Sequence, residues 1–88
     1  SLPSIDFAFI DGNHQYQPTL DYVEWILPKS TEQTILVLDD IHWSPQMEKA
    51  WKQLQTHPRV RISIDLFFIG MLLINPAFKA RQHFRIRY

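Results

Sequence analysis

Apolar residues in this chain first gather into two short continuous runs that each end in acidic residues. The first run covers residues 5–10 and is followed by Asp11, and the second covers residues 34–38 and is followed by Asp39 and Asp40. Continuous runs of this length, bounded by proline or glycine and rich in β-branched and aromatic residues, are typical of strands that are buried on both faces of a parallel sheet. We therefore expect two buried parallel strands.

The segments that follow these runs have the spacing of helices. Leu20, Val23, Ile26 and Leu27 recur on one helical face, and this spacing predicts a helix over residues 18–27, with Pro18 in its first turn and Pro28 at its end. Ser44 followed by Pro45 is a typical helix start. The residues of the second helix that fall on one stripe are Met47, Ala50, Trp51 and Leu54.

In the last third of the chain, apolar and polar residues alternate instead. Between residues 60 and 66 every second residue is apolar, which predicts a half-buried strand near the edge of the sheet. We expect a turn around residues 68–70 and a returning strand over residues 71–74, antiparallel because a parallel crossover needs a longer connection. Residues 77–82 suit a turn or short helix, and residues 83–88 suit one more strand. The order is β-α-β-α-β-β with a β-like tail.

Composition limits the class of protein. The 88 residues carry nine basic and nine acidic side chains, so no net charge favours nucleic acid or an anionic membrane. The chain has no cysteine, and its apolar run over residues 66–74 is far shorter than the roughly 20 residues that span a bilayer. We expect one globular unit over residues 1–88 in the cytoplasm, with neither nucleic acid nor membrane as a partner.

The polar residues that end the two runs are the candidate chemistry. Open α/β sheets bind ligands outside the carboxyl ends of their strands, and parallel strands would bring Asp11, Asp39 and Asp40 to one edge. His14 lies three residues after Asp11, where an imidazole could accept a proton near neutral pH. His42 and Trp43 follow the acidic pair and could line a pocket.

Two segments of the chain, taken with their order and spacing, resemble those of a known family. The segments are Phe-Ile-Asp-Gly-Asn-His (residues 9–14) and Leu-Val-Leu-Asp-Asp-Ile (residues 36–41). They are similar to the second half of class I S-adenosylmethionine-dependent methyltransferases, in the O-methyltransferase-like branch with DG-x-H and DD-I segments. The resemblance implies an α/β fold, the C-terminal half of a Rossmann-like methyltransferase sheet with parallel strands and a terminal antiparallel hairpin. It covers nearly the whole chain except the last dozen residues.

The same resemblance implies a function and a set of roles. It implies S-adenosylmethionine as cofactor, a small-molecule hydroxyl as methyl acceptor, and a magnesium ion held by Asp11, Asp39 and Asp40. Asp11 would then lie at the cofactor pocket as well as at the metal. Their positions on the same edge, rather than the resemblance, make His14 the candidate catalytic base and make His42 and Trp43 candidates for lining the cofactor or substrate pocket. With only two glycines, no glycine-rich cofactor loop can be written in this chain. We therefore expect a fragment that by itself neither binds the cofactor tightly nor turns over.

Other interpretations of these residues stay open. Asp39 and Asp40 could cap the following turn, His14 could be a hydrogen-bonded loop residue, and Trp43 could pack beneath Pro45. The Gly-Asn-His string at residues 12–14 also resembles part of the metallophosphoesterase signature, although Gln15 stands where that family has an acid. A non-catalytic association module is a further alternative. For the isolated chain we expect self-association through the exposed edge of residues 5–10, or a partner chain that supplies the missing half, because unpaired strand edges recruit other strands.

Overall fold

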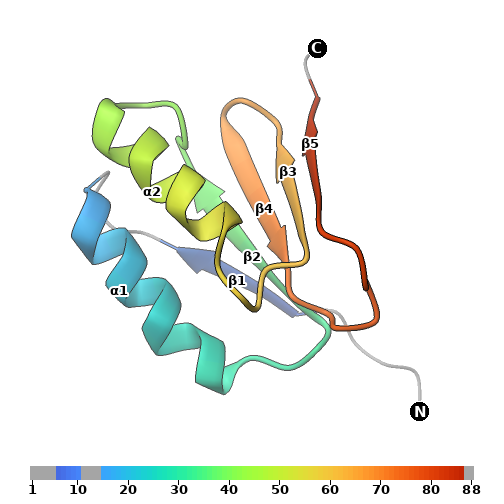
Figure 1. Ribbon diagram of the computed structural model, residues 1–88. Helices are drawn as coiled ribbons and strands as arrows, with labels where there is room; N and C mark the ends of the chain where they lie inside the picture. The colour runs from blue at the N-terminus through green and yellow to red at the C-terminus, as the bar shows by residue number, and fades with distance from the viewer. Residues whose placement is uncertain (1–5, 11–14, 87–88) are drawn as a thin grey trace.

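The computed structural model describes residues 6–10 and 15–86. Two helices lie on one side of a mixed five-stranded sheet in the strand order β1-β2-β4-β3-β5 (Figure 1). The strands are β1 (Asp6–Ile10), β2 (Thr34–Asp39), β3 (Ile62–Asp65), β4 (Ile69–Leu73) and β5 (Gln82–Arg85), and the helices are α1 (Tyr16–Ile26), the short 3-10 helix η1 (Leu27–Lys29) and α2 (Pro45–Gln55). The chain is thus α/β, consistent with a partial methyltransferase-like fold.

The direction of the strands follows the sequence prediction. β1 and β2 are parallel, with Ile10 beside Leu38 at their carboxyl ends. β3 and β4 form the expected antiparallel hairpin. β4 lies next to β2 and runs against it, and the chain's tail adds β5 parallel to β3. The carboxyl ends of β1, β2, β3 and β5 therefore meet at one edge of the sheet, which we call the rim.

The two helices begin and end close to the expected residues. α1 starts two residues before Pro18, and Pro28 lies in η1 rather than directly after the helix. In α2 the Ser44 hydroxyl accepts a hydrogen bond from the Met47 N–H at 3.2 Å, which is the predicted cap. All four residues of the predicted stripe of α2 are buried.

The hydrophobic core lies between the helices and the sheet. Leu36, Leu38 and Leu72 are fully buried on the strands, and Val23 and Leu54 meet them from the helices. No helix in the described ranges is long and apolar enough to cross a membrane.

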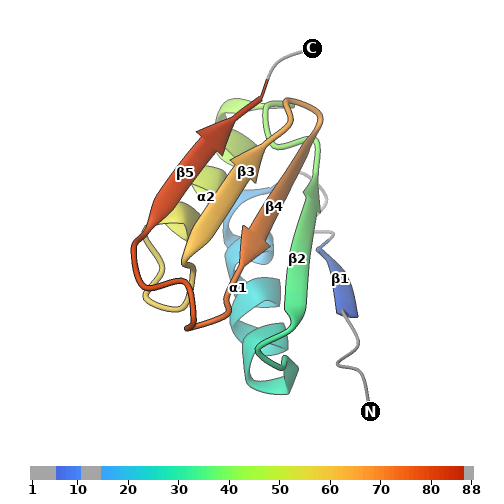
Figure 2. The same ribbon diagram turned by 90° about the vertical axis from the view of Figure 1, so that its right-hand side faces the viewer.

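The opposite face of the sheet carries no layer from the described residues. Figure 2 shows the five strands in front of both helices, with this face toward the viewer. We call it the open face. Phe7 is 55% exposed and Phe9 is 72% exposed there. The prediction that residues 5–10 form a strand buried on both faces is therefore wrong for β1, because the helices cover only one face and β1 lies at the sheet's edge.

The burial of β3 also differs from what its alternating sequence suggested. Its apolar residues Ile62 and Ile64 are only half-buried on the open face, whereas Ser63 and Asp65 are buried on the face that the helices cover. Alternation shows that the two faces of a strand differ, but it does not show which face the covering layer takes. The polar residues can be buried here because each has hydrogen-bond partners, as described below.

The hairpin turn also differs from the prediction. The strands pair up to Asp65 and Gly70, so the chain turns at residues 66–68 and Gly70 lies within β4. A Cβ on Gly70 would lie 2.5 Å from an atom of the Trp51 ring. Gly70 is therefore needed for the close approach of α2 to the sheet, rather than for a turn.

Candidate functional site at the sheet rim

Four segments meet at the rim: the loop after β2, the start of α2, the β3–β4 turn and the end of β5. Asp39 is the last residue of β2 and is exposed, and Asp40 follows it half-buried. Asp11 and His14 lie outside the described residues. The parallel pairing of β1 and β2 supports the premise that their polar ends share one edge of the sheet.

The backbone of the rim has an unusual conformation at two places in the described ranges. Asp40 has φ 53° and Phe67 has φ 73°, both in the left-handed region. For a residue as bulky as Phe this conformation costs on the order of 1–3 kcal/mol. The Asp40 N–H donates to the carbonyl of Phe68 at 2.7 Å, so the two loops are tied together. Such strain is typical of sites where the surrounding structure holds a particular geometry.

His42 is held in place by a buried carboxylate. Its Nε2 lies 2.7 Å from Oδ2 of Asp65, whose side chain is only 4% exposed. The imidazole stacks against Phe67, with ring centroids 5.4 Å apart, and its Nδ1 lies 3.8 Å from a carboxylate oxygen of Glu48. The structure thus places His42 at the rim, as predicted, and adds a partner that the sequence did not reveal.

Asp65 is the electrostatic centre of this arrangement. Burial would raise the pKa of Asp65, but the hydrogen bonds from the Phe67 N–H and His42 and the positive charges of His42 and Arg85 outweigh it, so the pKa is lowered. The Phe67 N–H donates to Oδ1 at 2.8 Å, and Arg85 Nε lies 3.6 Å from Oδ2. Asp65 therefore stays ionised and fixes both the histidine and the turn.

These side chains line a hollow of about 350 Å³. Its lining residues are His42, Glu48, Asp65, Phe67, Arg85 and Ile86, and we call it the rim hollow. Its volume is near the lower end of the range for small-molecule sites, about 300–1,000 Å³. One polar signal could have pointed to it, because Asp65 is an acid near the carboxyl end of the predicted strand over residues 60–66, and in the structure it is the last residue of β3.

Trp43 follows His42 in the sequence, and it is 67% exposed. The backbone N–H of Trp43 donates to the carbonyl of Asp40 at 2.9 Å, and this hydrogen bond closes the turn after β2. A large, exposed aromatic ring at the rim is suited to stack on a flat ligand ring.

The described residues do not support the predicted magnesium site. Among residues 6–10 and 15–86, no three His, Asp or Glu side chains gather as they would to hold a metal ion. Asp39 and Asp40 are two of the three predicted ligands, and Asp11 is outside the described ranges.

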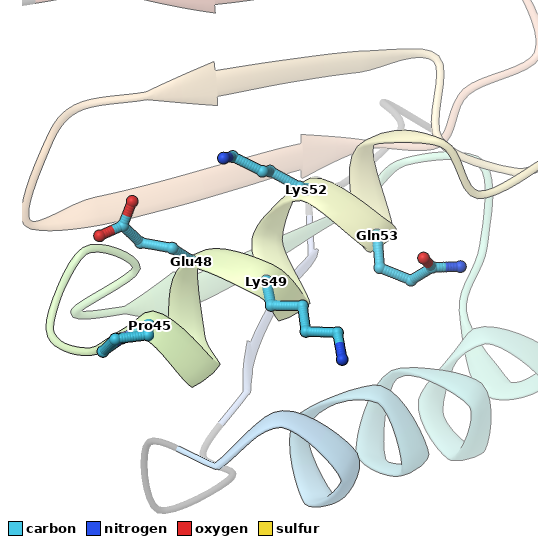
Figure 3. Close-up of a pocket in the computed structure, with 5 residues that line it drawn as sticks. All are labelled: Pro45, Glu48, Lys49, Lys52 and Gln53. Carbon is cyan, nitrogen blue, oxygen red and sulfur yellow. The ribbon is translucent and has the colours of Figure 1, made fainter.

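A larger hollow of about 460 Å³ lies on the outer surface of α2 and is a weaker candidate. Figure 3 shows its described lining, Pro45, Glu48, Lys49, Lys52 and Gln53, all on one helix. Lys49 projects toward α1, where its ammonium lies 4.5 Å from the centre of the Tyr16 ring, and Lys52 projects toward the strands. A ligand there would meet the side chains of a single helix.

One comparison with known proteins bears on the function. A family model described as a methyltransferase domain matches residues 1–41, slightly less than half of the 88-residue chain. The match supports a methyltransferase domain. It spans β1, α1 and β2 and ends one residue after Asp40. The comparisons with curated proteins and with solved structures found no match.

Proposed function

We propose that this chain forms part of an S-adenosylmethionine-dependent methyltransferase domain that transfers a methyl group to the hydroxyl of a small molecule. The observation that carries the proposal is the methyltransferase-domain match over a β1-α1-β2 unit whose strands are parallel. Parallel strands direct their carboxyl ends to one edge, where open α/β sheets bind ligands. The rim is then one wall of the methyl-transfer cleft.

The reaction needs few groups from this chain. S-Adenosylmethionine, when bound, supplies an electrophilic methyl group on a sulfonium ion. The acceptor oxygen forms the new bond to that carbon as the carbon–sulfur bond breaks, and the hydroxyl proton goes to a base, for which we propose His14. Holding the acceptor oxygen in line is worth about 7–11 kcal/mol in favourable systems. We assign that positioning to the rim residues, Asp39 and Asp40 among them.

The described part of the rim is suited to contact the methyl acceptor or the adenine ring of the cofactor. It is less suited to bind the rest of the cofactor. Trp43 offers an exposed ring, and His42 is rigidly held. The chain has two glycines, and Gly70 is packed against Trp51 within a strand. A loop that lets the ribose and methionine groups of the cofactor approach the backbone closely must therefore come from another segment, and we propose that this chain alone does not bind the cofactor tightly.

No reaction step is assigned to a cation. Asp39 and Asp40 could supply oxygen ligands, as magnesium prefers, but no three-residue group forms in the described ranges. The same finding gives no support to the metallophosphoesterase alternative, which needs further clusters of His and Asp. Titrating magnesium or manganese into the full-length protein, with Asp39→Ala as control, tests whether Asp39 takes part in binding it.

The test of the function uses the protein encoded by the complete reading frame. Transfer of a labelled methyl group from S-adenosylmethionine is measured against a panel of small hydroxyl compounds, including sugars and catechols. We expect transfer to at least one of them, and a decrease in kcat of about 10²–10⁴ for His14→Ala, the range for loss of a general base.

Asp39→Ala tests the rim, and Asp21→Ala on the exposed surface of α1 is the matched control. We expect the first to abolish most transfer and the second to leave it unchanged. A complete protein that neither binds the cofactor nor transfers the label contradicts the proposed function. Micromolar cofactor binding by the 88-residue chain in calorimetry contradicts only the proposal that this chain is insufficient.

A further inference from the structure

Two hydrogen-bond acceptors lie close together in the rim hollow. Nδ1 of His42 is 3.8 Å from Oε2 of Glu48, which is longer than a hydrogen bond. The other ring nitrogen of His42, Nε2, lies 2.7 Å from the carboxylate of Asp65, which is ionised. An ionised carboxylate can only accept a hydrogen bond, so the proton of the neutral imidazole is on Nε2. Nδ1 is then an acceptor, like the carboxylate of Glu48 beside it.

This pair of acceptors lacks a donor within the part of the chain that the structure describes. The Glu48 carboxylate makes no hydrogen bond to a described residue, and its side chain is 46% exposed. Nδ1 of His42 has no closer polar neighbour among the described residues than Glu48. A ligand that brings two donor groups side by side would satisfy both acceptors.

The rim hollow also offers a donor. The Arg85 side chain is 61% exposed, and its Nε lies 3.6 Å from Oδ2 of Asp65. Within residues 6–10 and 15–86, the guanidinium makes no hydrogen bond. Its N–H groups can therefore donate to a ligand in the hollow.

This combination of groups discriminates among classes of ligand. A carboxylate or phosphate group would be repelled by the negative charges of Glu48 and Asp65. An ammonium group could donate to the two acceptors, but it could not accept from Arg85. A hydroxyl group both donates and accepts. Two hydroxyls on adjacent carbons can therefore donate to His42 and Glu48 and accept from Arg85.

Phe67 and Ile86 give the hollow an apolar wall. They are 49% and 48% exposed, and the Phe67 ring stacks on His42. Small-molecule sites combine such apolar surfaces with a few polar groups that fix the orientation of the ligand. The C–H groups of a sugar ring can pack on these two side chains while its hydroxyls reach the polar groups.

We propose that the rim hollow binds a neutral sugar or similar polyol through two adjacent hydroxyls, which donate to His42 Nδ1 and the Glu48 carboxylate and accept from Arg85. This inference names the class of methyl acceptor. That the bound sugar is the acceptor rests on the proposed function, whereas the binding itself does not.

The hollow is close to the end of β2, where we place methyl transfer. The Asp40 N–H donates to the carbonyl of Phe68, so the loop after β2 lies beside the turn that carries Phe67. A sugar that is held by two hydroxyls in the hollow can present a third hydroxyl toward the end of β2.

The first experiment measures binding to the protein encoded by the complete reading frame, without cofactor, by ligand-observed NMR titration. The probes are the methyl glycosides of glucose, galactose and mannose, which present adjacent hydroxyls in different relative orientations. We expect at least one of them to bind. Removal of either bound hydroxyl, tested with the monodeoxy counterparts, should weaken binding about tenfold or more.

Substitutions at Glu48 test the acceptor pair. Glu48→Ala should weaken binding of the glycoside about tenfold or more, and Glu48→Gln, which keeps one acceptor oxygen, should weaken it less. Glu32→Ala is the matched control and should leave binding unchanged, because Glu32 is exposed and precedes β2 at the end of that strand away from the rim. In Glu48→Ala the preference for the glycoside over a deoxy counterpart that lacks the hydroxyl bound by Glu48 should disappear, which a loss of folded protein could not cause.

Three results overturn the proposal. None of the three glycosides binds, or Glu48→Ala binds as tightly as wild type, which would mean that Glu48 and His42 form an ion pair that needs no ligand. The third is tighter binding of a counterpart that carries a carboxylate or an ammonium group. Sugar binding without any methyl transfer contradicts the proposed function alone. Methyl transfer by a protein that binds no glycoside contradicts this inference alone.

Discussion

The two faces of the sheet are built from the same five strands, yet they have different environments. On the covered face Leu36, Leu38 and Leu72 are fully buried beneath the helices. On the open face Phe9 of β1 and Ile69 of β4 remain 72% and 40% exposed. The difference shows that residue type alone does not decide burial: the position of the covering layer does.

The covered face itself changes character across the sheet. β2 presents leucines to the helices, whereas β3 presents Ser63 and Asp65. The Ser63 hydroxyl accepts a hydrogen bond from Gln55 of α2 at 3.0 Å and lies 2.7 Å from a ring nitrogen of His83 in β5. Polar groups at this margin are buried at little cost because each is hydrogen-bonded.

The largest effect that we expect comes from a matched pair on β2. Leu36→Ala removes a fully buried side chain and should lower the free energy of unfolding by about 2–5 kcal/mol. Ile35→Ala, one residue away on the open face, should cost less than half as much. Urea denaturation with a common m-value measures both. Equal losses would mean that the open face is as well covered as the helix side.

Gly70→Ala tests how closely α2 approaches the sheet. The added methyl group would lie 2.5 Å from the Trp51 ring, so the ring or the helix must move, at a cost of about 1–3 kcal/mol. Combining it with Trp51→Leu should cost less than the sum of the two single changes, because the smaller side chain makes room. Full additivity in this double-mutant cycle would contradict the contact.

Asp65→Asn tests the polar margin through pH. The folded-state pKa of Asp65 is lowered, so its ionised form is favoured by folding. The stability that it contributes is fully present above the unfolded value of about 3.9 and is lost as the pH falls through the lower folded pKa. We expect a loss of about 1–3 kcal/mol at neutral pH, as for a hydrogen bond to a charged group.

Below pH 4 the difference between wild type and Asp65→Asn should decrease. A difference for Asp65→Asn that stays constant from neutral to acidic pH would contradict a role for the ionised carboxylate.

Much of the fold and part of the site could be predicted. Pro45 after Ser44 marked the start of α2, and the runs at residues 5–10 and 34–38 marked two parallel strands. His42 was a predicted site residue and does lie at the rim, but the proposed roles of Asp39, Asp40, His42 and Trp43 stay predictions. Asp65, Phe67 and Arg85 were missed, because β3 and β5 reach the rim only through long-range pairing.

The sequence by itself determined the type, direction and approximate bounds of the elements, since turn residues, caps and local periodicity act over a few positions. Only the tertiary structure decided which face of each strand is covered, that Asp65 holds His42, and that Glu48 and Arg85 share the rim hollow with them. These features depend on residues far apart in the chain, and their energies come from packing and hydrogen bonds that exist only after the strands have paired.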